Sequence, residues 1–135
     1  MRYIGIDFGL RKIGIALGDS ETKVAMPVEV LYLKKTKGQE GVEGVNEVLK
    51  LINAEGVDEV VVGVPLKSGD YSSDQLDITK KFIENLRVAS GVVVHEVDER
   101  FTSAESQRLK SEYGAEAEED ALSAMLILQS YFDNN

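Results

Sequence analysis

Apolar residues recur at every second position in two short runs near the start of the chain, over residues 2–8 and 13–17. This period of two is typical of β-strands, whose successive side chains point to opposite faces of a sheet. Gly9 lies between the runs and allows a tight reversal, so the pattern predicts a hairpin. The first strand then carries Ile4, Ile6 and Phe8 on one face and Tyr3, Gly5 and Asp7 on the other.

Three further strands are predicted downstream of the hairpin. Residues 27–35 alternate again, and Pro27 leads this strand. Residues 58–66 form a short continuous apolar run, which suits a strand that is buried on both faces. Residues 91–100 form the fifth strand and end in the charged sequence Asp-Glu-Arg.

Four segments have the apolar spacing of helices. They cover residues 42–52, 76–86, 102–114 and 118–132. Gly56 follows the first of them as a C-terminal stop, and Thr102 with Glu105 forms a capping box that opens the third. The last helix is apolar around most of its circumference, so we expect it to be largely buried.

The order of these elements, β-β-β-α-β-α-β-α-α, predicts an α/β domain that covers residues 1–135. Three antiparallel strands are followed by strand–helix–strand crossovers, which gives a five-stranded mixed sheet with helices on both faces. Functional sites in such sheets gather outside the carboxyl ends of the parallel strands. Asp7, the Val-Pro-Leu turn at residues 64–66 and the Asp-Glu-Arg sequence at 98–100 all lie at such ends.

Composition excludes several classes of site. At 135 residues, 43% hydrophobic and 29% charged, the chain suits one globular domain with a sizeable core. It has no cysteine, which excludes disulfides, thiolate metal sites and cysteine nucleophiles. No apolar run approaches the roughly 20 residues of a membrane span, and Asp7 and Arg11 interrupt any signal-peptide pattern. We therefore expect a cytoplasmic protein with no membrane association.

The charge is negative overall and unevenly distributed. A net charge of −9 argues against nonspecific adhesion to nucleic acid. Residues 1–50 nevertheless hold 8 Lys and Arg against 7 Asp and Glu, whereas residues 51–135 hold 7 against 17. The first third can therefore form a basic patch from Arg11, Lys12, Lys34, Lys35 and Lys37.

Three acidic positions are the candidates for chemistry: Asp7 ending the first strand, Glu99 ending the fifth, and Asp120 near the start of the last helix. Asp98 competes with Glu99, because neighbours on a strand face opposite ways. Plain structural roles also exist, since the strand end can pair with Arg100 and a carboxylate stabilises the first turn of a helix. Asp120, however, shares one face of its helix with apolar residues. A carboxylate that only caps the helix does not need to lie on an apolar face.

Three carboxylates that converge repel one another unless a cation lies between them. Two like charges 4 Å apart cost about 1 kcal/mol in water and about 4 kcal/mol at an effective dielectric constant of 20. A set of oxygen ligands suits Mg²⁺ or Mn²⁺ rather than Zn²⁺. One or two such ions activate water and support an in-line phosphoryl displacement, which is the chemistry of a nuclease. The glycines of the first hairpin do not fit the GxxxxGK[ST] phosphate loop, and the single histidine, His95, makes a serine–histidine triad a poor prediction.

Four blocks of the chain resemble the YqgF family, also called RuvX. They read GIDFGLRKIGIALGD, VVVGVPLKSGD, VHEVDERFTSAES and DALSAMLILQSYF, and they occur in the family's order over nearly all of the chain. The family is described as Holliday junction resolvases and as nucleases that mature the 5′ end of pre-16S ribosomal RNA. The resemblance implies a ribonuclease-H-like fold and places the acidic catalytic residues on Asp7, Glu99 and Asp120. The family is commonly basic just before the last Asp, whereas this chain reads GAEAEED.

The leading hypothesis is a nuclease that acts on precursor ribosomal RNA or branched DNA, with Arg11, Lys12 and Lys67 as candidate phosphate contacts. The first alternative is a non-catalytic module that binds proteins of ribosome assembly or transcription, which the acidic composition favours. The second is an ATP-binding domain like those of actin and sugar kinases, which open with a similar Asp-and-Gly hairpin. Those enzymes close two domains over the nucleotide, and this chain has room for one. Whether the protein is a monomer or a dimer stays open.

Overall fold

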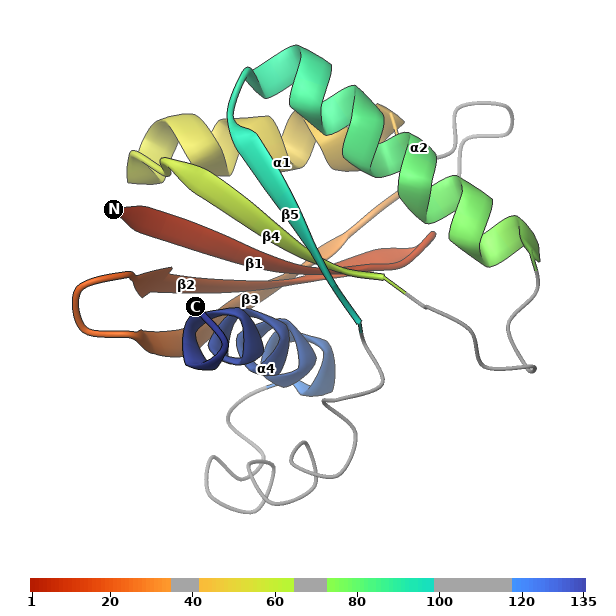
Figure 1. The fold of residues 1–135 in the computed structure, drawn as a ribbon. Helices are drawn as coiled ribbons and strands as arrows, with labels where there is room; N and C mark the ends of the chain where they lie inside the picture. The colour runs from red at the N-terminus through yellow and green to blue at the C-terminus, as the bar shows by residue number, and fades with distance from the viewer. Residues whose placement is uncertain (35–41, 65–72, 99–117) are drawn as a thin grey trace.

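The structure is a computed structural model that describes residues 1–34, 42–64, 73–98 and 118–135. Five strands and three helices lie in these ranges (Figure 1). They are β1 (Arg2–Phe8), β2 (Lys12–Asp19), β3 (Val24–Tyr32), α1 (Val42–Glu55), β4 (Glu59–Val64), α2 (Ser73–Ser90), β5 (Val93–Asp98) and α4 (Glu119–Asp133). None of the described helices is long and apolar enough to cross a membrane.

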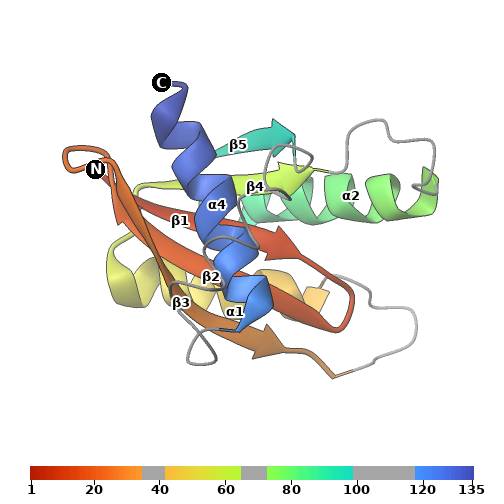
Figure 2. The same cartoon turned by 90° about the horizontal axis from the view of Figure 1, so that it is seen from below.

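The described strands form one mixed sheet in the order β3-β2-β1-β4-β5. The pairs β1–β2 and β2–β3 are antiparallel, and β1–β4 and β4–β5 are parallel. Figure 1 shows α1 and α2 on one face of this sheet and α4 on the other, and Figure 2 shows α4 crossing the strands. The predicted α/β class, mixed sheet and two-sided helical cover are therefore confirmed.

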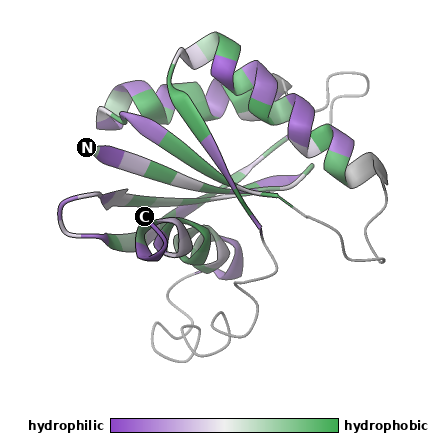
Figure 3. Cartoon of the chain, in the orientation of Figure 1, coloured by the Kyte–Doolittle hydropathy of each residue, from purple (hydrophilic) through white to green (hydrophobic). Residues whose placement is uncertain are grey.

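The sheet separates two hydrophobic clusters. Alternation along β1 sends Ile4, Ile6 and Phe8 toward α1 and α2, where they pack with buried residues such as Phe82 and Leu86. The other face of the sheet packs against α4. In Figure 3, β4 is hydrophobic along most of its length, whereas α2 alternates between hydrophilic and hydrophobic residues. This contrast fits a central strand that is buried on both faces and a helix that is buried on one.

Glycines form the contact surface beneath α4. A Cβ atom added at any of four sheet glycines would lie closer than 3.0 Å to an atom of α4: Gly5, Gly14, Gly18 and Gly63. At Gly5 the obstacles are Leu128 Cβ at 2.7 Å and the Ala124 carbonyl oxygen at 2.8 Å. Because these positions lack side chains, α4 packs directly against the strand backbones.

The third strand differs from the sequence prediction. β3 begins at Val24 rather than Pro27 and ends at Tyr32, so the proline lies inside the strand. Pro27 is tolerated there because β3 is an edge of the described sheet and a register shift lies opposite it, between Ile15 and Ala16. The helix expected over residues 102–114 lies outside the described residues. Gly56 follows α1 with a φ of +63°, as expected for a glycine that ends a helix.

Candidate active site

Gly14 lies between two of the predicted site residues, Asp7 of β1 and Asp120 of α4. Asp7 of β1 pairs with Gly14 of β2, and residues opposite each other in an antiparallel pair direct their side chains to the same face. A Cβ at Gly14 would lie 1.9 Å from the backbone oxygen of Asp120, in the first turn of α4. Asp7, near the carboxyl end of β1, therefore faces α4 close to the backbone of Asp120.

Asp120 has a basic partner that our sequence prediction did not include. The Lys12 Nζ lies 2.8 Å from the Asp120 Oδ2, and the two side chains are 54% and 29% exposed. The hydrogen bond to Asp120 raises the pKa of Lys12. Lys12 therefore offsets part of the negative charge at Asp120 without a bound ion. Lys12 and Gly14 share one face of β2, so the Lys12 side chain lies on the face that packs against α4.

A second contact holds the start of α4 against the same edge of the sheet. The Tyr32 hydroxyl donates to the carboxylate of Glu118, the N-cap residue of α4, and this hydrogen bond raises the pKa of Tyr32. Tyr32 pairs with Lys12 across β2 and β3, so the two side chains reach the first turn of α4 from neighbouring positions. The acidic stretch before Asp120 is thus tied to the sheet at Glu118.

The remaining predicted site residues are placed less completely. Glu99 and Lys67 lie outside the described residues, and Arg11 is exposed in the turn between β1 and β2. Asp98 is the last residue of β5. By alternation it shares a face of the sheet with Val94, which packs in the α1–α2 cluster, and with Glu96, which pairs with Lys80 of α2. Among the described residues, no three His, Cys, Asp or Glu side chains are grouped so as to hold a metal ion.

A different polar cluster lies under the C-terminal half of α4. The Glu59 Oε1 accepts from the Tyr3 hydroxyl at 3.2 Å and lies 2.5 Å from the His95 Nε2. The His95 ring in turn packs against Tyr131 in a tilted arrangement, with ring centroids 4.6 Å apart. Burial is the main cause that raises the pKa of Tyr3. His95 is therefore packed and hydrogen-bonded within the sheet–helix contact.

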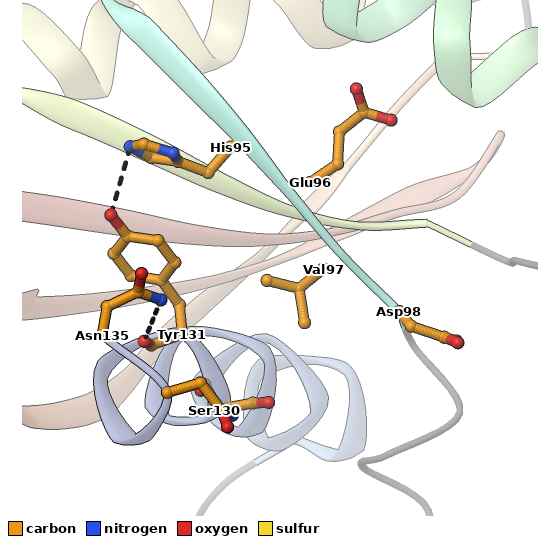
Figure 4. Close-up of a pocket in the computed structure, with 8 residues that line it drawn as sticks. His95, Glu96, Val97, Asp98, Ser130, Tyr131 and Asn135 are labelled. Atoms are coloured by element: carbon orange, nitrogen blue, oxygen red, sulfur yellow. Dashed lines mark hydrogen bonds between the residues drawn. The ribbon is translucent and has the colours of Figure 1, made fainter.

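Next to this cluster, a groove of about 560 Å³ runs between β5 and α4 (Figure 4). Its described lining consists of residues 95–98 together with Ser130, Tyr131, Asn134 and Asn135. None of these is Lys or Arg, and Glu96 and Asp98 contribute carboxylates, so the groove does not suit a phosphate. Tyr131 lies 11 residues after Asp120, about 16 Å along the helix axis. The α4 residues that line the groove therefore lie far from Asp120 along the helix.

Comparison with known proteins identifies relatives along the whole chain. The family model described as "RuvX: Holliday junction resolvase" matches residues 1–134. A Shewanella denitrificans protein named "Putative pre-16S rRNA nuclease" is 37% identical over 136 residues, which covers 97% of this chain and 93% of the relative. An Anaplasma marginale protein of the same name is 34% identical over 137 residues, with coverages of 98% and 84%.

The fold is also found in solved structures. The chain is similar to Thermus thermophilus RuvC, which was solved in complex with a Holliday junction substrate. The TM-score is 0.70 at 17% sequence identity, and the match covers 99% of this chain and 94% of that chain. At this identity the likeness concerns the fold, and it confirms the predicted ribonuclease-H-like class.

Proposed function

The chain belongs to the RuvX family of Holliday junction resolvases, and from this membership we propose that it is a metal-dependent nuclease that hydrolyses phosphodiester bonds. We assign residues 1–135 to one nuclease domain in the cytoplasm. The observation that carries the proposal is the meeting of Asp7 and Asp120 on one face of the sheet, across Gly14. Two carboxylates at the carboxyl end of a central strand are the start of a cation site.

The donor set fits a hard divalent ion. Both described candidate ligands offer carboxylate oxygens, which suit Mg²⁺ or Mn²⁺, and Asp120 already holds a cation in the ammonium group of Lys12. When bound, one or two such ions would supply an activated water and stabilise charge on the phosphoryl oxygens. Asp7 and Asp120 would hold the ion, and the packing of α4 on Gly14 would keep the two ligands together.

We assign the third carboxylate to Glu99 rather than Asp98. Val97 of β5 pairs with Gly63 of β4, and the pairing of Ile6 with Val62 sets Asp7 opposite the same Gly63. Val97 and Asp7 therefore lie at the same level of the sheet, on either side of β4. Val97 packs in the cluster beneath α4, whereas the side chain of Asp98 belongs to the opposite face. The next position with the parity of Val97 is residue 99. Strands β1 and β5 are separated only by β4, so their backbones lie about 10 Å apart, a span that two carboxylate side chains and an ion can bridge.

The substrate we propose is the 5′ precursor region of 16S ribosomal RNA, which the names of the full-length relatives support. Holliday junction DNA is the second candidate substrate, supported by the description of the family. Arg11, Lys12 and Lys67 are the proposed phosphate contacts. Because the net charge is −9, we expect weak, salt-sensitive binding to random duplex through this local set.

Cleavage of the two substrates side by side tests this function. Labelled precursor RNA and a labelled four-way DNA junction are incubated with the wild type and with Asp7→Asn, in Mg²⁺, Mn²⁺ or EDTA. We expect metal-dependent cleavage of the RNA by the wild type and nearly complete loss in the variant, since a ligand has lost its charge. Cleavage of the junction alone would reassign the substrate, and equal cleavage by both proteins would remove Asp7 from the site.

The acidic surface supports a second candidate function. In this case the chain is a non-catalytic module that binds proteins of ribosome assembly or transcription. Glu118 and Glu119 at the start of α4 are exposed, in a stretch where the family is commonly basic. Such a module needs no metal site. Failure of the wild type to bind Mn²⁺ or Mg²⁺, together with a lack of cleavage, would favour this function over the nuclease.

A further inference from the structure

The ammonium group that pairs with Asp120 belongs to Lys12, whose side chain can move. Lys12 is the first residue of β2, and its side chain is 54% exposed on a flexible four-carbon stem. The Asp120 carboxylate is 29% exposed, so solvent ions and substrate can reach the pair. Exposed ion pairs of this kind contribute little to stability and are readily exchanged. The Lys12–Asp120 contact is therefore easily opened.

A divalent ion held by Asp7 and Asp120 would repel this ammonium group. In water, a charge of +2 and a charge of +1 about 6–10 Å apart lower each other's binding by roughly fourfold to tenfold. The ion and Lys12 therefore compete for Asp120. In the metal-free protein Lys12 offsets one of the two carboxylate charges, whereas a divalent ion would offset both.

We propose that Lys12 is a positioning residue with two alternative partners, Asp120 in the metal-free protein and a phosphate of the nucleic acid once a divalent ion has bound. This inference rests on the proposed function, because it requires the metal site. In the metal-free state Lys12 holds the Asp120 carboxylate at the start of β2. In the metal-bound state it supplies one positive charge to a substrate beside the reacting centre.

Two features of the fold allow Lys12 to leave Asp120 without loosening α4. Tyr32, the neighbour of Lys12 across the β2–β3 ladder, is hydrogen-bonded to Glu118 and anchors the start of the helix independently. The backbone of Asp120 also rests directly on Gly14. Lys12 adjoins Arg11 in the exposed turn between β1 and β2, so a released ammonium group lies where a backbone phosphate can meet two cations.

Calorimetric titration with Mn²⁺ tests the competition directly. Lys12→Met removes the charge and keeps most of the aliphatic stem, so we expect it to bind Mn²⁺ roughly fourfold to tenfold more tightly than the wild type. The matched control is Lys50→Met. Lys50 pairs with Glu47 on α1, on the opposite face of the sheet, so this variant makes the same change in net charge and should bind Mn²⁺ as the wild type does.

Nuclear magnetic resonance follows the lysine itself. The ε-methylene signal of Lys12 in ¹³C-lysine-labelled protein, identified by its loss in Lys12→Met, should shift on addition of Mg²⁺, while that of Lys50 should not. At saturating metal, Lys12→Met should raise KM for the labelled precursor RNA by more than it lowers kcat, and Lys12→Arg should restore most of the loss. A lysine that only braces the fold would change neither the Mn²⁺ affinity nor KM in this way.

The two proposals fail differently in these experiments. If Asp7→Asn abolishes Mn²⁺ binding but Lys12→Met leaves the affinity unchanged or weaker, the competition is refuted and the metal site stands. An unmoved Lys12 signal at saturating Mg²⁺ refutes it as well. If the wild type binds no divalent ion, or Asp7→Asn binds it equally well, the metal site is refuted together with this inference.

Discussion

The face of the sheet that packs against α1 and α2 carries branched aliphatic side chains, whereas the face beneath α4 carries glycines at many of the neighbouring positions. Ile13 and Ile15 of β2 are fully buried on the first face, and Gly14 between them lies on the second. The same alternation occurs in β1, where Ile4 and Ile6 flank Gly5. Each of these strands thus presents large side chains to one helical layer and none to the other at these positions.

The difference separates stability from function. Large aliphatic side chains bury the most apolar area, so the α1–α2 face makes the bulk of the hydrophobic contribution to folding. Glycines forgo that contribution and let α4 approach the strand backbones closely. This approach sets the backbone of Asp120, in the first turn of the helix, on Gly14, the cross-strand partner of Asp7. A substitution on one face should therefore cost mainly stability, and one on the other face should also cost the site.

The largest effect is expected for Gly14→Ala. The new Cβ would lie 1.9 Å from a backbone oxygen of α4, which cannot rotate away as a side chain can. Overpacking typically costs about 1–3 kcal/mol, and we expect about 3 kcal/mol or more here, measured by urea denaturation. Because α4 is displaced, the Gly14→Ala variant should also lose Mn²⁺ binding. Intact Mn²⁺ affinity in a folded Gly14→Ala protein would contradict the claim that close packing builds the site.

Gly56→Ala is the control for Gly14→Ala. A Cβ at Gly56 meets no atom within 4 Å, but the φ of +63° is strained for alanine. We expect a loss of about 1 kcal/mol in the free energy of unfolding and unchanged Mn²⁺ affinity. The pair of variants thus distinguishes a steric clash at the site from a general cost of replacing glycine.

A smaller and purely structural effect is expected for Ile15→Val on the opposite face. Ile15 neighbours Gly14 and is fully buried in the α1–α2 cluster. Loss of one methylene should cost about 0.5–1.5 kcal/mol in the free energy of unfolding. Mn²⁺ affinity and cleavage should stay at wild-type levels when measured well below the melting temperature. A large fall in metal affinity would show that the two faces are not independent.

The smallest effect is expected for Glu96→Gln, and it should depend on pH. The hydrogen bond from Lys80 is the main cause that lowers the pKa of Glu96 from its ordinary value of 4.5, and Arg87 adds to it. A lowered pKa in the folded state stabilises the protein above pH 4.5, and this stabilisation is lost as the pH falls through the lowered value. The variant should be less stable by about 0.2–1 kcal/mol at pH 7, and the difference should vanish in acid. A difference that persists at low pH would rule out the ion pair as its cause.

The period of the apolar residues and the order of the predicted elements were enough to predict most of the fold. Alternation assigned the faces of β1, and the order of elements gave the mixed sheet with helices on both sides. The start of β3 was predicted at Pro27 instead of Val24, because a proline is typical of a strand start, although an edge strand tolerates an internal proline near a register shift. Such tolerance depends on which strand lies at the edge, and sequence order alone does not show this.

The candidate site was predicted in part. Alternation placed Asp7 on the face of Tyr3 and Gly5, and an apolar stripe lies beside Asp120; in the structure the backbone of Asp120 packs on Gly14, the cross-strand partner of Asp7. The partner of Asp120 was missed, because the Lys12–Asp120 pair joins residues 108 positions apart in the sequence. Recognising it requires the packing of α4 on Gly14, which is a tertiary contact between a glycine and a helix backbone. No local pattern encodes that contact, although four glycines on one sheet face are a signal that could have suggested it.

The most direct test of a shared cation site at Asp7 and Asp120 compares thermal melting of the wild type and Asp7→Asn, in EDTA and in several millimolar Mg²⁺ or Mn²⁺. Asparagine keeps the shape of the side chain and removes one charge from the cluster, so in EDTA the variant should melt no lower than the wild type. The wild type should then gain stability with metal by mass action, about 2.7 kcal/mol at a hundredfold excess over Kd, and the variant should gain clearly less. An equal drop in the melting temperature of the variant with and without metal would contradict the account, because Asp7 would then support only the fold.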